Sequence, residues 1–128
     1  MAVELNHTIV AASDAAASAT WYAELFRLAA PIRYGPFWQV STSNGVNLDF
    51  QTVEAGAQIS PQHYAFLIGD DDFDEIFGGV VERGMSYFAD PFATRRGEIN
   101  HNDGGRGVYF PDPDGHWLEI ITRPYGSS

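Results

Sequence analysis

The sequence predicts an α+β fold in which a strand–helix–three-strand unit (βαβββ) occurs twice in tandem. The first observation behind this prediction is a repeat: His7 stands seven residues before Asp14, and His63 stands seven residues before Asp70. In both copies the aspartate comes next to a segment that reads as a helix. We expect the two copies to form one mostly antiparallel sheet with the helices on its outer face.

The second observation is a matched turn near the end of each copy. Gly45 precedes Asp49 by four residues, and Gly115 precedes Glu119 by the same number. In both strands the neighbours of the carboxylate are apolar, so one face of each strand packs on a helix and the other is more polar. This parity predicts a sheet that is buried on one side and concave on the other.

Length and spacing favour one domain made of both copies. The chain has 128 residues, enough for one ordinary domain and short for two independent ones. We expect module 1 over about residues 1–55 and module 2 over about residues 60–125. The small, polar segment 54–57 is the candidate linker.

The first copy contains one expected helix and four expected strands. Ser13 or Asp14 can cap the helix, because a short oxygen side chain accepts a hydrogen bond from the free N–H groups of the first turn. Pro31 is expected to end it. The expected bounds are 15–28 for the helix and 5–10, 32–34, 37–42 and 46–52 for the strands.

The second copy repeats this order of elements, but different residues begin and end its helix. Asp70, Asp71 and Asp72 are expected to cap its helix, where negative charge suits the positive end of the helix dipole. Gly84 is expected to end the helix, and His116, beside a turn glycine, is expected at the surface. The expected bounds are 73–83 for the helix and 62–68, 87–88, 107–111 and 117–122 for the strands.

Composition excludes several classes of partner. The formal net charge of −10 repels phosphate backbones and anionic membrane surfaces, so we expect no nucleic-acid or membrane partner. No apolar run approaches the ~20 residues that span a bilayer, and the N-terminus lacks the pattern of a secretory signal. Cysteine is absent, which excludes disulfides and thiol chemistry. A cytoplasmic protein that takes a small molecule is the default expectation.

One long polar segment, residues 90–106, has no counterpart in the first copy. It contains Arg95, Arg96 and Arg106, together with His101. We interpret it as a lid or rim over the site, because a long loop in a compact domain is usually functional. Its arginines can hold an anionic group of a ligand, and His101 can act as a mobile acid or base. The alternative is a solvated loop whose cations balance nearby acids.

The repeat places four metal-ligand types at equivalent positions: His7, Asp49, His63 and Glu119. Two imidazoles and two carboxylates brought to one pseudo-twofold axis predict a divalent-metal site. His, His and Glu form a facial triad, and the shorter Asp49 reaches the ion through water or acts as a base beside it. The alternative is a pair of hydrogen-bonded structural histidines. Iron, manganese, nickel, zinc and cobalt are all compatible with these ligands.

Aromatic side chains complete the candidate site. Tyr109 has the strand parity to face the carboxylates, where its phenol can stabilise an oxyanion or donate a proton. The alternative is a barrel-lining aromatic with its hydroxyl in water. A planar ligand can stack on an aromatic cup of four residues: Trp21, Tyr34, Trp38 and Trp117.

Three segments resemble the vicinal oxygen chelate superfamily, which includes glyoxalase I, fosfomycin and bleomycin resistance proteins, methylmalonyl-CoA epimerase and extradiol dioxygenases. They are Leu5–His7, Trp21–Phe26 and, most specifically, Gly107–Glu119. The resemblance implies paired βαβββ modules, a cup-shaped sheet and a homodimer. It places the metal positions on His7, Asp49, His63 and Glu119, and an active-site tyrosine on Tyr109. Glyoxalase I-like members carry Glu or Gln where this chain has Asp49.

These features predict a metal-dependent enzyme that acts on a small oxygenated metabolite or antibiotic. The first expectation is glyoxalase-like lyase or isomerase chemistry, in which Asp49 or Glu119 moves a proton on a metal-chelated, enediolate-type intermediate. The first alternative is an Fe(II) ring-cleaving dioxygenase with Tyr109 as a donor. The second is a non-catalytic protein that binds a drug or metabolite.

Overall fold

The computed structural model describes residues 2–126 of the chain. Contacts divide the chain between Ile59 and Ser60 into two compact units, unit 1 and unit 2, each with one α-helix and one sheet. In the described residues no helix has both the length and the apolar character to cross a membrane.

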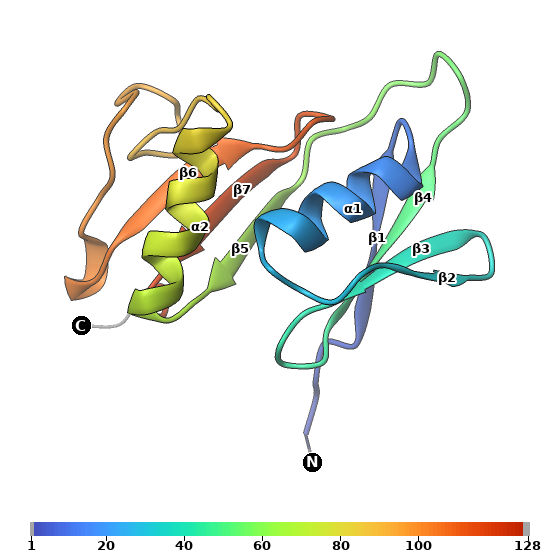
Figure 1. The fold of residues 1–128 in the computed structure, drawn as a ribbon, viewed down its shortest axis with the longest axis horizontal. Coiled ribbons are helices and arrows are strands. Elements are labelled where there is room, and N and C mark those ends of the chain that lie inside the picture. Colours follow the sequence, from blue (N-terminus) through green and yellow to red (C-terminus); the bar gives the residue numbers. More distant parts are fainter. Residues whose placement is uncertain (1, 127–128) are drawn as a thin grey trace. The chain divides into compact units, whose positions relative to one another are not determined.

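Unit 1 is a four-stranded sheet with one helix (Figure 1). The strand order is β1-β4-β3-β2, in which β1 and β4 are parallel and the other neighbours are antiparallel. The elements are β1 (His7–Ala12), α1 (Ala15–Leu25), β2 (Ile32–Tyr34), β3 (Phe37–Ser41) and β4 (Asn47–Thr52).

The start of α1 confirms one of the two expected caps, whereas its end differs from the expectation. Asp14 is the N-cap, and its carboxylate accepts a hydrogen bond from the backbone N–H of Ala17 at 3.1 Å. The helix ends at Leu25, well before Pro31. Arg27 takes a left-handed conformation with φ 55°, and the N–H of Leu28 reaches back to the carbonyl of Ala23 at 2.9 Å. This bond closes a Schellman-type end on a residue other than glycine.

The core of unit 1 lies between α1 and one face of the sheet. Tyr22 of α1 is fully buried, and its ring packs against Phe50 of β4 with centroids 4.8 Å apart. Leu48 is buried on the same face, as strand alternation requires. Asp49 therefore points to the opposite face, and we call this opposite face of each sheet its carboxylate face.

Unit 2 repeats the arrangement with a three-stranded sheet in the order β5-β7-β6 (Figure 1). β5 and β7 are parallel, whereas β6 and β7 are antiparallel. The elements are β5 (His63–Leu67), α2 (Asp70–Glu82), the short 3₁₀ helix η1 (Asn102–Gly104), β6 (Gly107–Pro111) and β7 (Trp117–Ile121). The strand expected at 87–88 is reduced to isolated bridges, one of which joins Phe88 to Tyr109.

The start of α2 differs from the expectation. Gly69 is its N-cap residue, and Asp70, Asp71 and Asp72 belong to the first helical turn. Their carboxylates act on the helix dipole rather than as a side-chain cap, because the cap position makes no side-chain hydrogen bond. The helix ends as expected at Gly84, whose φ of 67° suits glycine.

His116 is the clearest correction. It is 1% exposed, although its place beside Gly115 predicted a surface residue. Its ring Nδ1 accepts a hydrogen bond from the backbone N–H of Gln62 at 3.0 Å. The backbone N–H of His116 donates to the Asp112 carboxylate at 2.8 Å. The turn after β6 folds this ring inward, where it fastens the segment that enters β5.

The predicted fold class is confirmed: the protein is α+β and built from tandem modules. In each unit the first strand is parallel to the last, the helix follows the first strand, and an antiparallel pair completes the sheet. The carboxylates occupy equivalent registers, since Ile9 pairs with Asp49 and Ala65 pairs with Glu119.

Candidate metal centre

His63 and Glu119 form the most direct candidate for a metal-binding pair. They stand on the parallel neighbours β5 and β7. His63 pairs with Trp117, and Glu119 is two residues after Trp117 on the same face of β7. This diagonal brings Nε2 of His63 to 3.2 Å from Oε1 of Glu119. Glu119 is only 5% exposed, so its carboxylate is largely removed from water.

A backbone carbonyl fixes the tautomer of His63. Its Nδ1 lies 2.9 Å from the carbonyl oxygen of Trp117, which can only accept, so Nδ1 carries the proton and donates it. In the neutral ring the Nε2 lone pair then faces the carboxylate of Glu119. Two electron-pair donors facing each other need a cation between them, either a proton or a metal ion. Such a carbonyl contact is also how metal-ligating histidines are held.

The spacing of the two donor atoms fits a divalent ion. Two ligands with bonds of about 2.1 Å stand roughly 3.0 Å apart at a right angle and roughly 3.4 Å apart at the tetrahedral angle. The observed 3.2 Å lies between these values. Imidazole nitrogen and carboxylate oxygen are both ligands of zinc and of the transition metals. The pair is therefore suited to hold an ion after little movement.

Tyr109 supports Glu119 from the neighbouring strand. It stands directly opposite Glu119 on β6 and is 6% exposed. Burial raises the pKa of the Tyr109 phenol well above its ordinary value, and the hydrogen bond to Glu119 and the charge of that carboxylate raise it further. The phenol is therefore neutral at physiological pH and donates a hydrogen bond to the carboxylate of Glu119. The expected inward parity of Tyr109 is observed within unit 2.

An aromatic wall continues from Tyr109. The ring of Trp117 stacks on Tyr109 with centroids 6.1 Å apart at an interplanar angle of 16°, and Phe88 packs against Trp117 at 5.6 Å. His63 stacks on Tyr109 at 6.0 Å. Nε1 of Trp117 is buried and, among residues 2–126, is the one such side-chain N or O atom without a hydrogen-bond partner.

Unit 1 arranges the equivalent residues differently. Asp49 is 6% exposed, and its Oδ1 accepts a hydrogen bond from Nε2 of Gln39 at 2.9 Å. His7 is exposed, and its Nδ1 lies 2.7 Å from Oδ1 of Asn6. In the described part of the chain no hydrogen bond or ion pair joins His7 to Asp49. The shorter aspartate is held by β3 rather than by the histidine of its own unit.

The four metal positions fall in both units, and each unit holds two of them. Taken by itself, neither unit brings three histidine, aspartate or glutamate side chains together within the described residues. The complete set His7, Asp49, His63 and Glu119 remains a prediction from the repeat.

The four aromatic residues of the expected cup do not share one face of a sheet. Trp38 pairs with the buried Phe50, so it lies on the helix side of the unit 1 sheet. The guanidinium carbon of Arg33 lies over its ring, 5.7 Å from the ring centroid. Trp21 belongs to α1, on that same side. Tyr34 lies on the carboxylate face and is 66% exposed. Trp117 belongs to the aromatic wall of unit 2.

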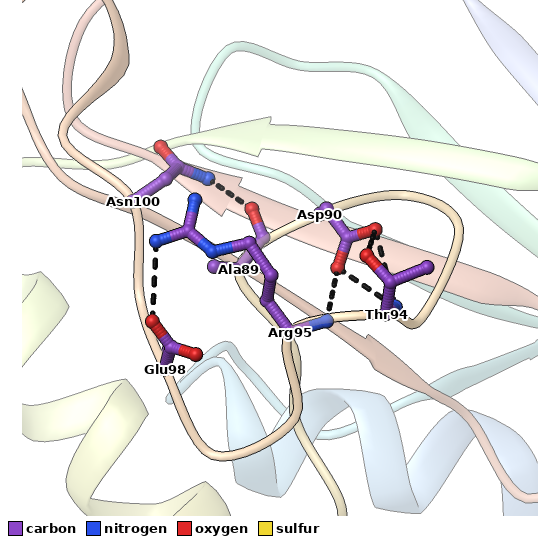
Figure 2. Close-up of polar contacts among 6 residues, drawn as sticks. All are labelled: Ala89, Asp90, Thr94, Arg95, Glu98 and Asn100. Atoms are coloured by element: carbon purple, nitrogen blue, oxygen red, sulfur yellow. Dashed lines mark hydrogen bonds and ion pairs between the residues drawn. The ribbon is translucent and has the colours of Figure 1, made fainter.

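The loop before β6 is an ordered structure. Figure 2 shows Asp90 accepting hydrogen bonds from the backbone N–H groups of Thr94 and Arg95 and from the Thr94 hydroxyl. Loss of hydration raises the pKa of the Asp90 carboxyl, but these hydrogen bonds outweigh it and leave the pKa below its ordinary value. Asn100 is buried and donates to the carbonyl of Ala89 at 2.8 Å (Figure 2).

The arginines of this loop have partners of their own. Arg95 pairs with Glu98 at 3.1 Å, and Arg96 donates to the hydroxyl of Ser86 at 2.9 Å. Arg106 reaches α2, where it pairs with two aspartates of the first turns. Arg95 and Arg106 thus balance nearby acids, as the alternative interpretation of the loop expected. His101 is exposed.

Sequence reasoning missed Gln39. The signal that could have found it is the repeat itself, because Gln39 stands opposite Asp49 as Tyr109 stands opposite Glu119. Without the pairing register of β3 and β4, Gln39 cannot be told from an ordinary polar residue of a strand.

Comparisons with known proteins identify the family of this chain. The family model described as "Glyoxalase/Bleomycin resistance protein/Dioxygenase superfamily" matches residues 4–120. The solved structure of "Oxidase ChaP-H1" is 60% identical and superposes with a TM-score of 0.93, covering 98% of this chain and 100% of that one.

Two curated relatives are more distant. "Glutathione transferase FosA" of Serratia marcescens is 29% identical, over 94% of this chain and 81% of its own length. "Metallothiol transferase FosB" of Shouchella clausii (strain KSM-K16) is 28% identical, over 92% of this chain and 79% of its own length. With a family model matched over nearly its whole length, the chain belongs to the glyoxalase/bleomycin resistance protein/dioxygenase superfamily.

Proposed function

We propose that this protein is a divalent-metal-dependent oxidase of a small oxygenated molecule. The observation that carries the proposal is the 60% identity, over 98% of this chain and 100% of the other, to a protein named an oxidase. The superfamily contains metal-dependent enzymes, which bind small-molecule substrates and commonly form dimers. The His63–Glu119 pair of unit 2 fits a divalent ion in donor type and spacing.

In this proposal His63 and Glu119 would hold the ion. The sequence repeat predicts His7 as the third ligand of a His, His, Glu triad. A divalent ion bound by such a triad supplies open positions for two neighbouring oxygens of the substrate and lowers the energy of negative charge on them. Iron, manganese and cobalt suit an oxidase better than zinc, because zinc has no redox chemistry.

The remaining residues hold and move protons. The neutral phenol of Tyr109 donates a hydrogen bond to Glu119, which holds that carboxylate in a fixed orientation. The phenol has one O–H, so it can stabilise a substrate oxygen that becomes negative only by turning from Glu119 to that oxygen. Asp49 is the proton acceptor for a substrate hydroxyl. Trp117, stacked on Tyr109, offers its ring to a planar part of the substrate.

The proposal is tested by oxygen uptake. Purified protein is stripped of metal, reloaded with Fe²⁺, Mn²⁺, Co²⁺, Ni²⁺ or Zn²⁺, and offered catechols, 2-hydroxyketones and vicinal diols in an oxygen electrode. We expect oxygen consumption with a redox-active ion and a matching oxidised product. His63→Ala should abolish it, and Glu82→Gln, which changes an exposed residue at the end of α2, should not.

Two other outcomes would reject the oxidase proposal. Conversion of a substrate with no oxygen consumed would support the lyase or isomerase chemistry that the sequence first suggested. Recovery of unchanged ligand from a tight complex, with an affinity insensitive to chelator, would support a binding protein.

A further inference from the structure

Each unit holds its buried carboxylate by a neutral donor on the adjacent antiparallel strand. In unit 2 the donor is Tyr109, opposite Glu119. In unit 1 it is Gln39, opposite Asp49 at 2.9 Å. The two pairs share register and face, but they differ in chemistry: a phenol can release a proton to a base, whereas an amide cannot.

The amide of Gln39 controls what Asp49 can do. Asp49 is 6% exposed, and a carboxylate removed from water is costly unless it accepts hydrogen bonds. The amide N–H of Gln39 donates to Oδ1 and so occupies that oxygen. In the described residues no group donates a hydrogen bond to Oδ2. That oxygen is available on the carboxylate face.

We propose, on the basis of the function argued above, that Gln39 is a positioning residue for Asp49. Its amide holds the carboxylate against β3, away from the imidazole of His7, and leaves Oδ2 to accept the proton of a substrate hydroxyl. Asp49 is then a fixed base, and the ligand role belongs to Glu119, whose longer side chain reaches a histidine of its own unit. The difference between Asp49 and Glu119 at matched positions of the repeat thus accompanies a difference of role.

The same strand pair offers a matched control. Ser41 lies two residues from Gln39 on the same face of β3, and its hydroxyl donates to Oδ1 of Asn47 at 2.6 Å. This bond joins β3 to β4 as the Gln39–Asp49 bond does, but it involves no ionisable group. Ser41→Ala removes an equivalent cross-strand contact while leaving Asp49 untouched.

The first experiment measures the hydrogen bond without turnover. Nitrogen-15 NMR of the full chain follows solvent exchange of the Gln39 side-chain amide in wild type, Asp49→Ala and Ser41→Ala. We expect slow exchange in wild type and Ser41→Ala and at least about tenfold faster exchange in Asp49→Ala. Equal exchange in all three proteins would show that Gln39 does not hold Asp49 in solution.

The second experiment asks whether this contact matters for the reaction. Gln39→Leu and Gln39→Glu are compared with Ser41→Ala in the oxygen-uptake assay, with melting temperature and bound metal measured on each. Gln39→Glu keeps the size of the side chain but replaces the donor by a like charge opposite Asp49. We expect kcat to fall about ten- to hundredfold in both, with KM changed less than about threefold and metal content unchanged.

Three results separate the claims. Gln39 variants that keep wild-type kcat would overturn the positioning role. Gln39 variants that lose the metal would overturn the assignment of Asp49 as a base, because Asp49 would then belong to the ligand set. A wild-type protein that binds metal but consumes no oxygen would sink the oxidase proposal, and the exchange experiment would still decide whether Gln39 holds Asp49.

Discussion

The pKa of Tyr109 is set by its surroundings in unit 2. Its phenol has an ordinary strand position, yet burial and Glu119 together keep it protonated far into the alkaline range. A tyrosine with a raised pKa in the folded state favours folding most below its unfolded pKa of about 10. Its contribution to stability is lost as pH rises through the folded pKa.

Because the pKa of Tyr109 is raised on folding, the stability of the protein should fall at alkaline pH. Wild-type protein should lose stability between about pH 10 and pH 11 more steeply than Tyr109→Phe, which has no proton to release. Urea unfolding midpoints measured from pH 8 to pH 11 provide the test. Tyr34→Phe, which changes a tyrosine that is 66% exposed, is the control. Equal slopes for wild type and Tyr109→Phe would contradict the buried, Glu119-bonded phenol.

Arg27 is a second residue whose conformation has a testable cost. It closes α1 with φ 55°, in the region where side chains other than glycine are strained. The equivalent position of unit 2 is Gly84, at φ 67°. Arg27→Gly should therefore raise the free energy of unfolding by about 0.5–1 kcal/mol, and Gly84→Ala should lower it by a similar amount, as measured by urea denaturation. A destabilising Arg27→Gly would show that its side chain outweighs the strain.

At the scale of elements, the loop over residues 90–100 behaves as a built structure. Asp90 accepts hydrogen bonds from three donor groups of Thr94 and Arg95, and Asn100 holds the other end through the carbonyl of Ala89 (Figure 2). Because the pKa of Asp90 is lowered in the folded state, the stability it adds is present above its ordinary value of 3.8 and is lost as pH falls below that value.

We expect Asp90→Ala to loosen this loop and leave the sheets intact. Backbone N–H groups of Thr94 and Arg95 should exchange with solvent faster in the variant, whereas those of β6 should be unchanged. Glu98→Ala, which removes only the exposed partner of Arg95, should have little effect on either. Unchanged exchange at Thr94 in Asp90→Ala would mean that other contacts order the loop.

The sequence predicted strands better than the ends of helices. Strands β2 and β6 have the expected bounds, since alternating side chains and turn residues mark them locally. The end of α1 was placed too late because Arg27 carries no sequence signal for a left-handed conformation. His116 was placed outside because burial of a turn residue depends on Gln62, more than fifty positions earlier.

For the candidate site, the sequence predicted which residues are equivalent but not what each one contacts. Strand parity placed Asp49 and Glu119 opposite the apolar residues next to them, as observed. It could not show that Gln39 takes one oxygen of Asp49, since that depends on the antiparallel register of β3 and β4. The sequence predicted Trp38 to stack on a ligand, but its pairing with Phe50 places it on the face of the unit 1 sheet that packs against α1.

At the scale of the whole molecule, the carboxylate faces expose apolar side chains that a monomer would leave in water. Ile9, Ile32 and Tyr34 in unit 1 and Leu67 in unit 2 are each more than half exposed. The superfamily commonly dimerises, and we propose a homodimer for this chain. Light scattering coupled to size exclusion should give twice the chain mass of 14.1 kDa. A mass of one chain across micromolar concentrations would contradict it.

The central claim is that His63 and Glu119 hold a divalent ion, and metal content tests it most directly. Protein purified without added metal is analysed by mass spectrometry of the elements as wild type, His63→Ala, Glu119→Ala and the loop control His101→Ala. We predict close to one ion per site in wild type and His101→Ala, and loss of the ion from the other two with the fold retained by circular dichroism. The same metal in the same amount in all four proteins would contradict the account.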